Sequence, residues 1–124
     1  MNETNILLID DDDIGNFISE KILTEMGFSN ITAVTDGKQA LESLKKENCP
    51  KLVFLDINMP VMDGFAFLTR AVKEILCKQM NVVILTSSNR KSDKNKASQF
   101  SNVVDYIEKP LNQDKVRQVL EKVN

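Results

Sequence analysis

Five short apolar runs alternate along this chain with segments of helical periodicity, and this alternation restricts the folds open to it. The runs occupy residues 6–9, 31–34, 52–55, 82–85 and 103–107. Three of them are nearly continuous in apolar character, as expected of strands that helices cover on both faces. Strands that alternate with helices predict a parallel sheet with right-handed crossovers. We therefore expect an α/β fold with five parallel strands in the middle layer of a three-layer sandwich.

The segments between the runs carry apolar stripes at the spacings of amphipathic helices. The stripes consist of Ile14, Phe17, Ile18 and Ile22 in the first segment, Ala40, Leu41 and Leu44 in the second, Phe65, Leu68, Val72, Ile75 and Leu76 in the third, and Val116, Val119, Leu120 and Val123 in the last. The second segment follows the turn signal Asp36-Gly37. We interpret all four stripes as the core-facing sides of helices.

The segment 87–102 differs from the other helical segments in its charge. Its basic residues include Arg90, Lys91, Lys94 and Lys96. Only Ala97 and Phe100 offer apolar anchors, so a helix here would bury little and should be the least stable of the set. We interpret the charges as a solvated face, with docking of a partner as the alternative.

Length and composition indicate one domain over residues 1–124. The chain is 42% hydrophobic and 27% charged, which is ordinary for a soluble globular protein. The net charge of −2 offers no basic field for nucleic acid and no polybasic patch for a membrane. No stretch approaches the roughly 20 apolar residues of a membrane span, and residues 1–5 lack the features of a signal peptide. We expect a cytoplasmic protein that binds neither nucleic acid nor membrane.

The two cysteines are Cys49 and Cys77, and the chain has no histidine. We expect no disulfide in a reducing compartment, and two cysteines without a histidine make a poor zinc site. Both are therefore interpreted as structural thiols. The lack of histidine excludes a histidine general base and a phosphohistidine on this chain, so phosphohistidine chemistry would need a partner.

Acidic residues follow two of the apolar runs. Four consecutive aspartates, 10–13, follow the first run, and Asp56 follows the third. Ligands of an open parallel sheet bind beyond the carboxyl ends of the strands, where the strand order reverses. With the order 2-1-3-4-5, strands one and three are neighbours about 4.8 Å apart, so Asp10, Asp11 and Asp56 can share one ion. Mg²⁺ suits this cluster, and without it the carboxylates should raise one another's pKa.

Two later runs end on residues that complete a site for phosphoryl transfer. Thr86 offers a hydroxyl at the end of the fourth run. Lys109 ends the fifth, roughly 10 Å from Asp56 at that strand spacing, and a lysine stem covers much of this distance. One nucleophilic carboxylate, two metal-binding acids, a cation and a hydroxyl fit phosphoryl transfer to Asp56. Single residues of this kind are often caps, and we expect Asp12 or Asp13 to cap the first helix.

Four blocks of this sequence together resemble a CheY-like receiver domain of two-component response regulators. The blocks are ILLIDD (6–11), DINMPVMDG (56–64), TS (86–87) and YIEKP (106–110). The second block is highly specific, and all four stand in the order of the family. The resemblance covers essentially the whole chain and implies the flavodoxin-like fold of a stand-alone, single-domain regulator.

The resemblance implies a role for each matching acidic residue. Asp56 would accept the phosphoryl group. Asp11 would bind Mg²⁺ directly, together with Asp56 and the backbone carbonyl of Asn58. Asp10 would act largely through bound water.

The other matching residues would respond to phosphorylation. Thr86 would hydrogen-bond the phosphoryl group, and Lys109 would pair with one of its oxygens. Tyr106 would change rotamer as Thr86 moves. In the family the Lys-Pro peptide bond is commonly cis, so the resemblance makes Lys109-Pro110 a candidate cis peptide bond.

A receiver of this kind would be a phosphoacceptor switch that catalyses only its own phosphorylation and slow dephosphorylation. A histidine kinase or a histidine phosphotransfer protein would supply the phosphoryl group. Phosphorylation with Mg²⁺ would shift a pre-existing two-state equilibrium, and the output would be binding to a protein that the sequence does not name. We expect a monomer when the chain is unphosphorylated.

Other functions were weighed against this one. A haloacid-dehalogenase-like phosphohydrolase would use Asp10 as its nucleophile, but Ile14 stands where that motif has Thr or Val, and the chain is short for that core with a cap. A receiver fold that is never phosphorylated would bind its partner in either state, and the intact site argues against it. A calcium-binding loop from Asp10 is excluded because Lys21 occupies its twelfth position, where a bidentate glutamate is needed.

Overall fold

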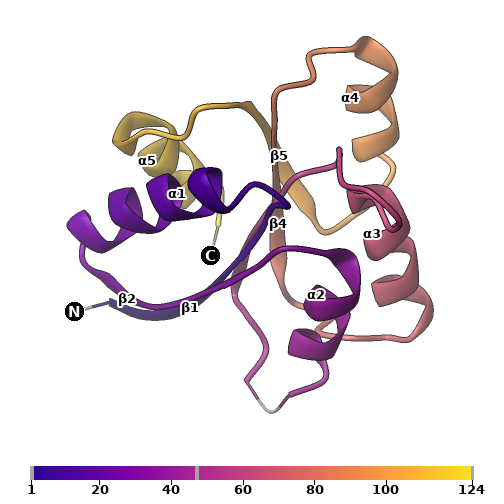
Figure 1. Ribbon diagram of the computed structural model, residues 1–124, viewed down its shortest axis with the longest axis horizontal. Helices are drawn as coiled ribbons and strands as arrows, with labels where there is room; N and C mark the ends of the chain where they lie inside the picture. Colours follow the sequence, from indigo (N-terminus) through magenta and orange to yellow (C-terminus); the bar gives the residue numbers. More distant parts are fainter. Residues whose placement is uncertain (1, 47, 124) are drawn as a thin grey trace.

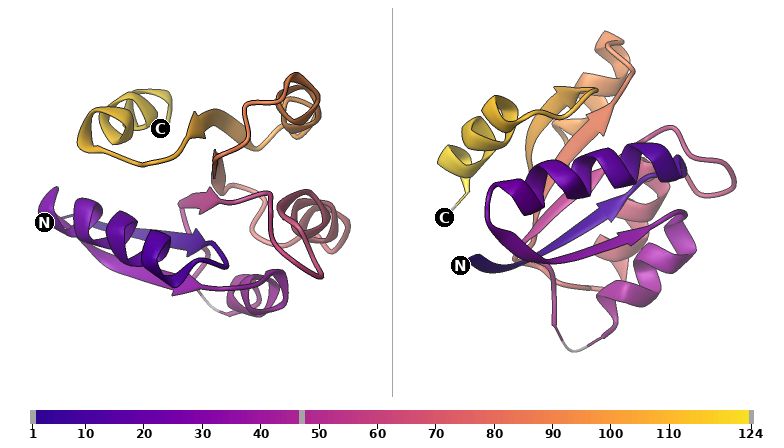
Figure 2. Two further views of the ribbon diagram at one scale, coloured as in Figure 1. Left: turned by 45° about the horizontal axis from the view of Figure 1, so that its top comes forward. Right: turned by 60° about the vertical axis from the view of Figure 1, so that its left-hand side comes forward.

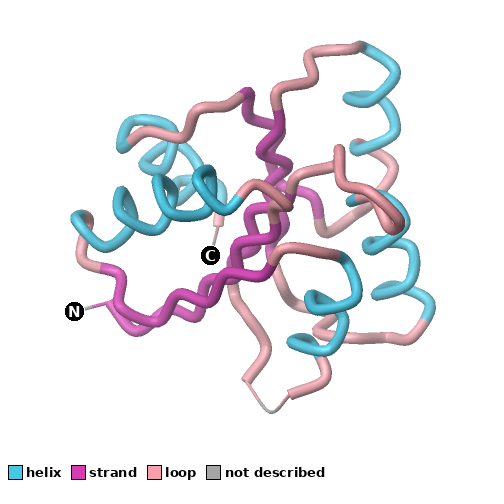
Figure 3. The backbone as a smooth tube through the Cα atoms, in the orientation of Figure 1, coloured by secondary structure: helices cyan, strands magenta, loops and turns pink. Residues whose placement is uncertain are grey.

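The computed structural model describes residues 2–46 and 48–123, so Met1, Glu47 and Asn124 of the expected domain lie outside it. Its centre is a parallel sheet of five strands in the order β2-β1-β3-β4-β5, which confirms the predicted fold and strand order (Figures 1 and 3). The strands are β1 (Asn2–Ile9), β2 (Phe28–Val34), β3 (Leu52–Leu55), β4 (Asn81–Thr86) and β5 (Val103–Glu108). Each strand contains one of the predicted apolar runs.

Helices cover both faces of the sheet and complete the three layers (Figure 2). The helices are α1 (Asp13–Glu25), α2 (Gly37–Leu44), α3 (Gly64–Lys73), α4 (Lys91–Ala97) and α5 (Gln113–Lys122). The first and last helices pack on one face, and the other three pack on the opposite face. Among the described helices, none is both long and apolar enough to cross a membrane.

The strand side chains alternate between two cores, one under each layer of helices. Ile9 faces the core with α2 and α3, whereas Leu8 faces the core with α1 and α5. β3 is buried at every position because it lies between two strands and under helices on both faces. In the pairing of β1 with β3, Ile9 lies beside Leu55. Asp10 and Asp56 therefore leave adjacent strand ends.

The apolar stripe of α1 is exposed to solvent in most of its members, so its interpretation as core packing is wrong. Ile14 and Phe17 are 70% and 68% exposed. The buried residues of this helix are Asn16, Ser19 and Leu23. Asn16 takes an inward position because its side-chain amide donates to the carbonyl oxygens of Asp10 and Val34, at 3.0 and 3.1 Å. Asp12 caps the helix through a bond from the Ile14 amide, as expected.

The apolar stripe of α2 is confirmed in full, and those of α3 and α5 are confirmed in part. The buried ones are Ala40, Leu41 and Leu44 of α2, Phe65 and Leu68 of α3, and Val116 and Val119 of α5. Val72, Ile75 and Leu120 are exposed, and Ile75 lies beyond the last residue of α3. α4 buries only Ala97, as its basic sequence predicts, and Phe100 stacks on Phe65 with ring centroids 6.2 Å apart.

The two cysteines form a disulfide bond, so the expectation of two free thiols is wrong. The Cα atoms of Cys49 and Cys77 lie 5.5 Å apart, within the range that a disulfide spans. Pairing of β3 with β4 brings together the residues that precede these strands. At the start of β4, the backbone amide of Asn81 donates to the carbonyl oxygen of Lys51, which precedes β3, at 2.8 Å. A separation of 28 residues hides this contact from an inspection of the sequence.

Candidate functional site

Three aspartates converge at the carboxyl ends of β1 and β3. Asp10, Asp11 and Asp56 each place a carboxylate oxygen within 4.8 Å of the other two. Asp10 and Asp56 are buried, whereas Asp11 is exposed. The structure thus brings together the three carboxylates that the strand order predicted, with one of them open to solvent.

Backbone amides hold one oxygen of each buried carboxylate. The amide of Asp12 donates to Oδ1 of Asp10 at 2.9 Å, and the amide of Asn58 donates to Oδ1 of Asp56 at 3.0 Å. In both cases the donor lies two positions after the aspartate, so the turn that follows each strand fixes its own carboxylate. The second oxygen, Oδ2, is left for other partners.

The ammonium of Lys109 contacts both of these second oxygens. Its Nζ lies 2.6 Å from Oδ2 of Asp10 and 3.2 Å from Oδ2 of Asp56. The Lys109 amide donates to the carbonyl oxygen of Thr86 at 2.8 Å, and the Lys109–Pro110 peptide bond is cis. Burial lowers the pKa of Lys109, but the hydrogen bond to Asp10 and the charges of both carboxylates raise it overall above 10.5. The amine is therefore a fixed cation at neutral pH.

Burial is the main reason that the pKa of Asp10 is raised above its usual 3.8. Hydrogen bonds from Lys109 and from the Asp12 amide oppose this rise. The negative charge of Asp56 adds to it and is the smallest of the named contributions. The mutual repulsion expected from the sequence is thus present at Asp10 but secondary to burial. A buried carboxylate in this state gains from an additional cation nearby.

Polar contacts connect Thr86 at the end of β4 with Tyr106 in β5. The buried Thr86 Oγ1 accepts hydrogen bonds from the side-chain amide of Asn58 at 3.3 Å and from the backbone amide of Ser88 at 3.4 Å. The Tyr106 hydroxyl donates to the carbonyl oxygen of Ser88 at 2.9 Å. Thr86 and Tyr106 therefore share Ser88 as a partner, and a movement of Thr86 has a direct route to the tyrosine.

Gly64 allows α3 to begin against the loop that carries Asp56. A Cβ atom at this position would lie 2.6 Å from the backbone oxygen of Asp56 and 2.8 Å from the Cα of Ile57. Both are backbone atoms, which cannot move aside as a flexible side chain can. The close packing of α3 against the Asp56 loop therefore requires glycine at position 64.

All of these residues lie within the match to the family model described as the response regulator receiver domain, which covers residues 6–121. The chain belongs to this family. Receiver domains act as phosphoacceptor switches in two-component signalling, and histidine kinases or phosphotransfer proteins phosphorylate them. The CheY-like resemblance of the sequence is thereby confirmed.

Relatives of this receiver domain are found among both sequences and solved structures. Chemotaxis protein CheY of Bacillus subtilis is 33% identical over 94% of this chain and 94% of that protein. A two-component response regulator from Cytophaga hutchinsonii matches with a TM-score of 0.90 and 29% identity, over 98% of this chain and 97% of that one. Other relatives are longer, and the chain spans 13% and 52% of two of them.

A second similar structure is described with a metal. It is the receiver domain of a sensor histidine kinase from Pseudomonas aeruginosa PAO1, described with a magnesium ion coordinated in the active site cleft. It has a TM-score of 0.84 and 23% identity, and the match covers 98% of each chain. At this identity the likeness shows a shared fold.

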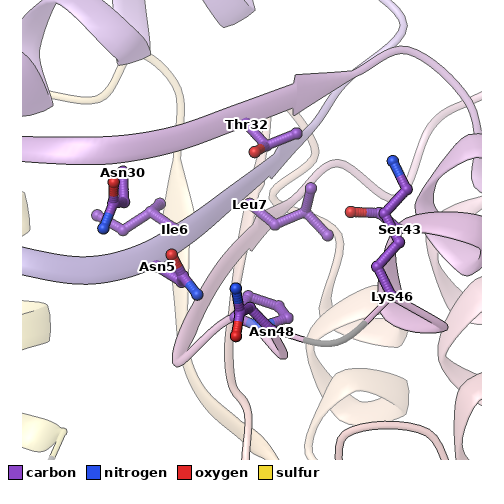
Figure 4. Close-up of a pocket in the computed structure, with 9 residues that line it drawn as sticks. Asn5, Ile6, Leu7, Asn30, Thr32, Ser43, Lys46 and Asn48 are labelled. Carbon is purple, nitrogen blue, oxygen red and sulfur yellow. The ribbon is translucent and has the colours of Figure 1, made fainter.

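Two hollows of this receiver domain lie at opposite ends of the sheet. One, of about 190 Å³, opens beside α1 at the acidic cluster. Its lining includes Asp10, Ile14, Ile18, Lys109 and Leu111. The other, of about 450 Å³, lies at the far end of β1 and β2, where it is lined by residues including Asn5, Asn30, Thr32, Ser43 and Lys46 (Figure 4). Among the described residues, no carboxylate lines this second hollow, whereas Asp10 and Asp12 line the first.

Inspection of the sequence missed the position of Asn16 in the site and the backbone contact of Ser88 with Tyr106. Asn16 binds the backbone of Asp10 and so holds the end of β1 in place. Ser88 acts on Tyr106 through its backbone carbonyl, a role that any residue type can fill and that therefore leaves no signal.

Proposed function

We propose that residues 1–124 form one receiver domain in which Asp56 accepts a phosphoryl group from a phosphohistidine. The contacts of the Lys109 ammonium with Asp10 and Asp56, at 2.6 and 3.2 Å, carry this proposal. A carboxylate oxygen of Asp56 bonds to phosphorus as the donor's nitrogen–phosphorus bond breaks, and the electron pair of that bond returns to the imidazole. The ammonium offsets the negative charge on the phosphoryl oxygens in the loose transition state.

The acidic cluster fits a magnesium ion. Three carboxylate oxygens within 4.8 Å of one another are hard donors of the kind that Mg²⁺ prefers. Asp10, Asp11 and Asp56 would hold the ion together with the backbone carbonyl of Asn58. Bound Mg²⁺ would supply positive charge to the phosphoryl oxygens. The magnesium described in the receiver from Pseudomonas aeruginosa supports this assignment.

Thr86 and Tyr106 are proposed to transmit the phosphorylation state. Thr86 Oγ1 accepts two hydrogen bonds in this structure, and it donates none to the described residues, so its proton can be donated to a phosphoryl oxygen. A shift of Thr86 toward Asp56 would pull on the Ser88 amide and disturb the bond from Tyr106 to the same residue. Phosphorylation would then favour one of two pre-existing states.

The phosphoryl donor is proposed to dock on the exposed stripe of α1. The chain has no histidine, so the phosphohistidine of this proposal lies on a partner, a histidine kinase or a histidine phosphotransfer protein. Ile14, Phe17 and Ile18 are all exposed, and two of them line the hollow that opens on Asp10 and Lys109. An apolar patch beside a polar site is typical of a protein-binding surface.

We further propose that the output is binding to a second protein, and that the chain is cytoplasmic and monomeric when unphosphorylated. It catalyses no turnover beyond its own phosphorylation and dephosphorylation. We propose neither nucleic acid nor a membrane as a partner.

Labelling with acetyl phosphate tests the phosphoacceptor directly. With Mg²⁺ present, we expect the wild-type chain to gain one phosphoryl group and Asp56→Ala to gain none. Asp13→Asn is the matched control, because Asp13 is exposed and lies outside the cluster. Undiminished labelling of Asp56→Ala would overturn the assignment. Repeated turnover of a phosphomonoester that depends on Asp10 would favour the phosphohydrolase instead.

A further inference from the structure

The Cys49–Cys77 disulfide lies at the end of the sheet opposite the acidic cluster. Cys49 precedes β3, whereas Asp56 follows it, and Cys77 lies between α3 and β4. The bond therefore joins both ends of the segment that contains β3, Asp56 and α3. These are the two cysteines of the chain, so no third thiol competes within it.

The surroundings of the disulfide are cationic. Both cysteines line a surface hollow of about 580 Å³, to which Lys51 and Lys78 also contribute. The other lining residues, Pro50, Gln79, Met80 and Asn81, are uncharged. Its described lining thus holds two cations and no carboxylate, a charge that attracts anions. It also favours the thiolate form of a sulfur released within it.

The two cysteines differ in their exposure to solvent. Cys49 is exposed, whereas Cys77 is half-buried with a backbone φ of 48°. The Cys77 Sγ lies 3.4 Å from the carbonyl oxygen of Leu44. A disulfide sulfur has no proton to donate, but once the released Cys77 thiolate has taken up a proton, the thiol would find this acceptor already in place. An incoming thiolate therefore has its open approach at Cys49, with Cys77 as the leaving group.

We propose that Cys49–Cys77 is a thiol–disulfide exchange site for an anionic low-molecular-weight thiol. The first thiolate bonds to Cys49 Sγ, the bond between the two cysteines breaks, and the Cys77 thiolate leaves with the electron pair. A second thiolate attacks the small-molecule sulfur of the mixed disulfide and releases the Cys49 thiolate. Two small thiols are thereby oxidised to one disulfide, and the protein disulfide is reduced to two cysteines that take protons from water.

Exchange at this site breaks the covalent link between the two ends of the segment 49–77, which contains Asp56, and leaves the carboxylates of the acidic cluster unchanged. The four residues of β3 separate the two ends, a span of about 13 Å at the usual rise of a strand. A disulfide in a cytoplasmic protein is commonly transient and sensitive to redox conditions. The redox state of the two cysteines therefore affects the stability of the segment that carries Asp56. The phosphorylation of Asp56 itself stays the same in both redox forms.

Single cysteine variants test which sulfur is attacked. An oxidised small disulfide such as glutathione disulfide is incubated with Cys77→Ser and with Cys49→Ser, and the mixed disulfide is measured by mass spectrometry. We expect it to accumulate on Cys77→Ser, which retains the exposed Cys49, and to be largely absent from Cys49→Ser. Equal modification of both, or alkylation of both cysteines in the untreated oxidised wild type, would overturn the proposal.

A charge comparison tests the chemical class of the thiol. Wild type, Lys51→Gln and Lys78→Gln are reduced with glutathione, which is anionic, and with the neutral 2-mercaptoethanol. The ratio of the glutathione rate to the 2-mercaptoethanol rate should fall in both variants and stay unchanged in Lys21→Gln, an exposed lysine of α1 outside the hollow. An unchanged ratio in both variants would overturn the preference for an anionic thiol.

Phosphorylation of the two redox forms separates this site from the phosphoacceptor. Oxidised and reduced wild type should be labelled by acetyl phosphate to the same extent, which supports exchange at a site remote from the carboxylates. Loss of labelling on reduction would overturn the claim that phosphorylation is independent of the disulfide. Failure of labelling in both forms would count against the proposed function and leave the cysteine measurements intact.

Discussion

The Lys109 ammonium lies 2.6 Å from Oδ2 of Asp10, closer than it lies to the proposed phosphoacceptor. Burial disfavours the charged form of Asp10, and the lysine offsets part of that cost. A metal ion at the cluster would take over this task. The Lys109 ammonium could then bind a phosphoryl group on Asp56, whose carboxylate it already contacts at 3.2 Å.

Removal of the Lys109 charge should destabilise the metal-free protein. In Lys109→Met, two buried carboxylates lose their shared cation, and uncompensated buried charge costs about 3 kcal/mol or more. Urea unfolding at neutral pH measures this loss, and Mg²⁺ should restore part of it. The control Lys21→Met removes an exposed charge and should stay within about 0.5 kcal/mol of wild type. An equal, small effect in both variants would contradict the shared ion pair.

The exposed stripe of α1 should affect docking and not stability. Phe17→Ala is expected to change the unfolding free energy by less than about 0.5 kcal/mol, because the ring is in solvent. Leu23→Ala, on the buried face of the same helix, should cost about 2–5 kcal/mol. Thermal or urea unfolding of the two variants checks this contrast, and a large loss in Phe17→Ala would mean that the ring belongs to the core.

Phosphotransfer kinetics test the second part of the same idea. Phe17→Ala should slow transfer from a phosphorylated histidine phosphotransfer protein, since that donor must dock. Labelling by acetyl phosphate, which needs no protein surface, should proceed as in wild type. A variant slowed equally with both donors would place Phe17 in the chemistry and not in docking.

Tyr106 should titrate above its ordinary range and weaken the fold at high pH. Burial is the main reason that the pKa of its phenol is raised above 10.0. The folded chain therefore keeps a proton that the unfolded chain loses. The unfolding free energy should fall as pH rises above 10.0 and level off beyond the folded pKa. Tyr106 is the single tyrosine and there is no tryptophan, so tyrosinate absorbance reports this residue alone.

The titration is read in native protein and in concentrated urea. The native midpoint should be the higher of the two. Tyr106→Phe should show a smaller loss of stability over the same alkaline range. Coincident midpoints in the native and unfolded chains would contradict the buried, hydrogen-bonded position of the hydroxyl.

The disulfide should contribute measurably to stability. Closing a loop with a separation of 28 residues restricts the unfolded chain, and the chain-entropy model gives about 3–4 kcal/mol for this length. The double variant Cys49→Ser/Cys77→Ser should therefore unfold at lower urea concentration than the oxidised wild type. Reduced wild type should resemble the double variant. Identical unfolding midpoints in all three would show that the bond does not form in solution.

The positions of the strands and of the charged site residues could be predicted because they rest on short-range patterns. Each apolar run became a strand, and parallel pairing requires that Asp10 and Asp56 leave neighbouring ends. Lys109 reaches the cluster because its strand is two strands from Asp56 and its side chain is long. These conclusions follow from strand order and side-chain length alone.

The orientation of α1 and the disulfide bond depend on contacts between segments that are distant in sequence. Periodicity alone assigned the apolar stripe of α1 to the core, although the backbone carbonyls of Asp10 and Val34 draw the polar Asn16 inward. The meeting of Cys49 with Cys77 depends on how the loops before two strands come together. Neither relationship has a local signature, since each is decided by the packed structure.

Borohydride trapping of the phosphorylated chain, followed by peptide mass spectrometry, is the most direct test of the central claim. The reagent reduces an aspartyl phosphate and leaves a permanent mark at the residue that carried it. Treatment with acetyl phosphate should place this mark on Asp56 alone and only when Mg²⁺ is present. A mark on Asp10 or Asp11, or the same mark on Asp56 after removal of divalent ions with a chelator, would contradict the account.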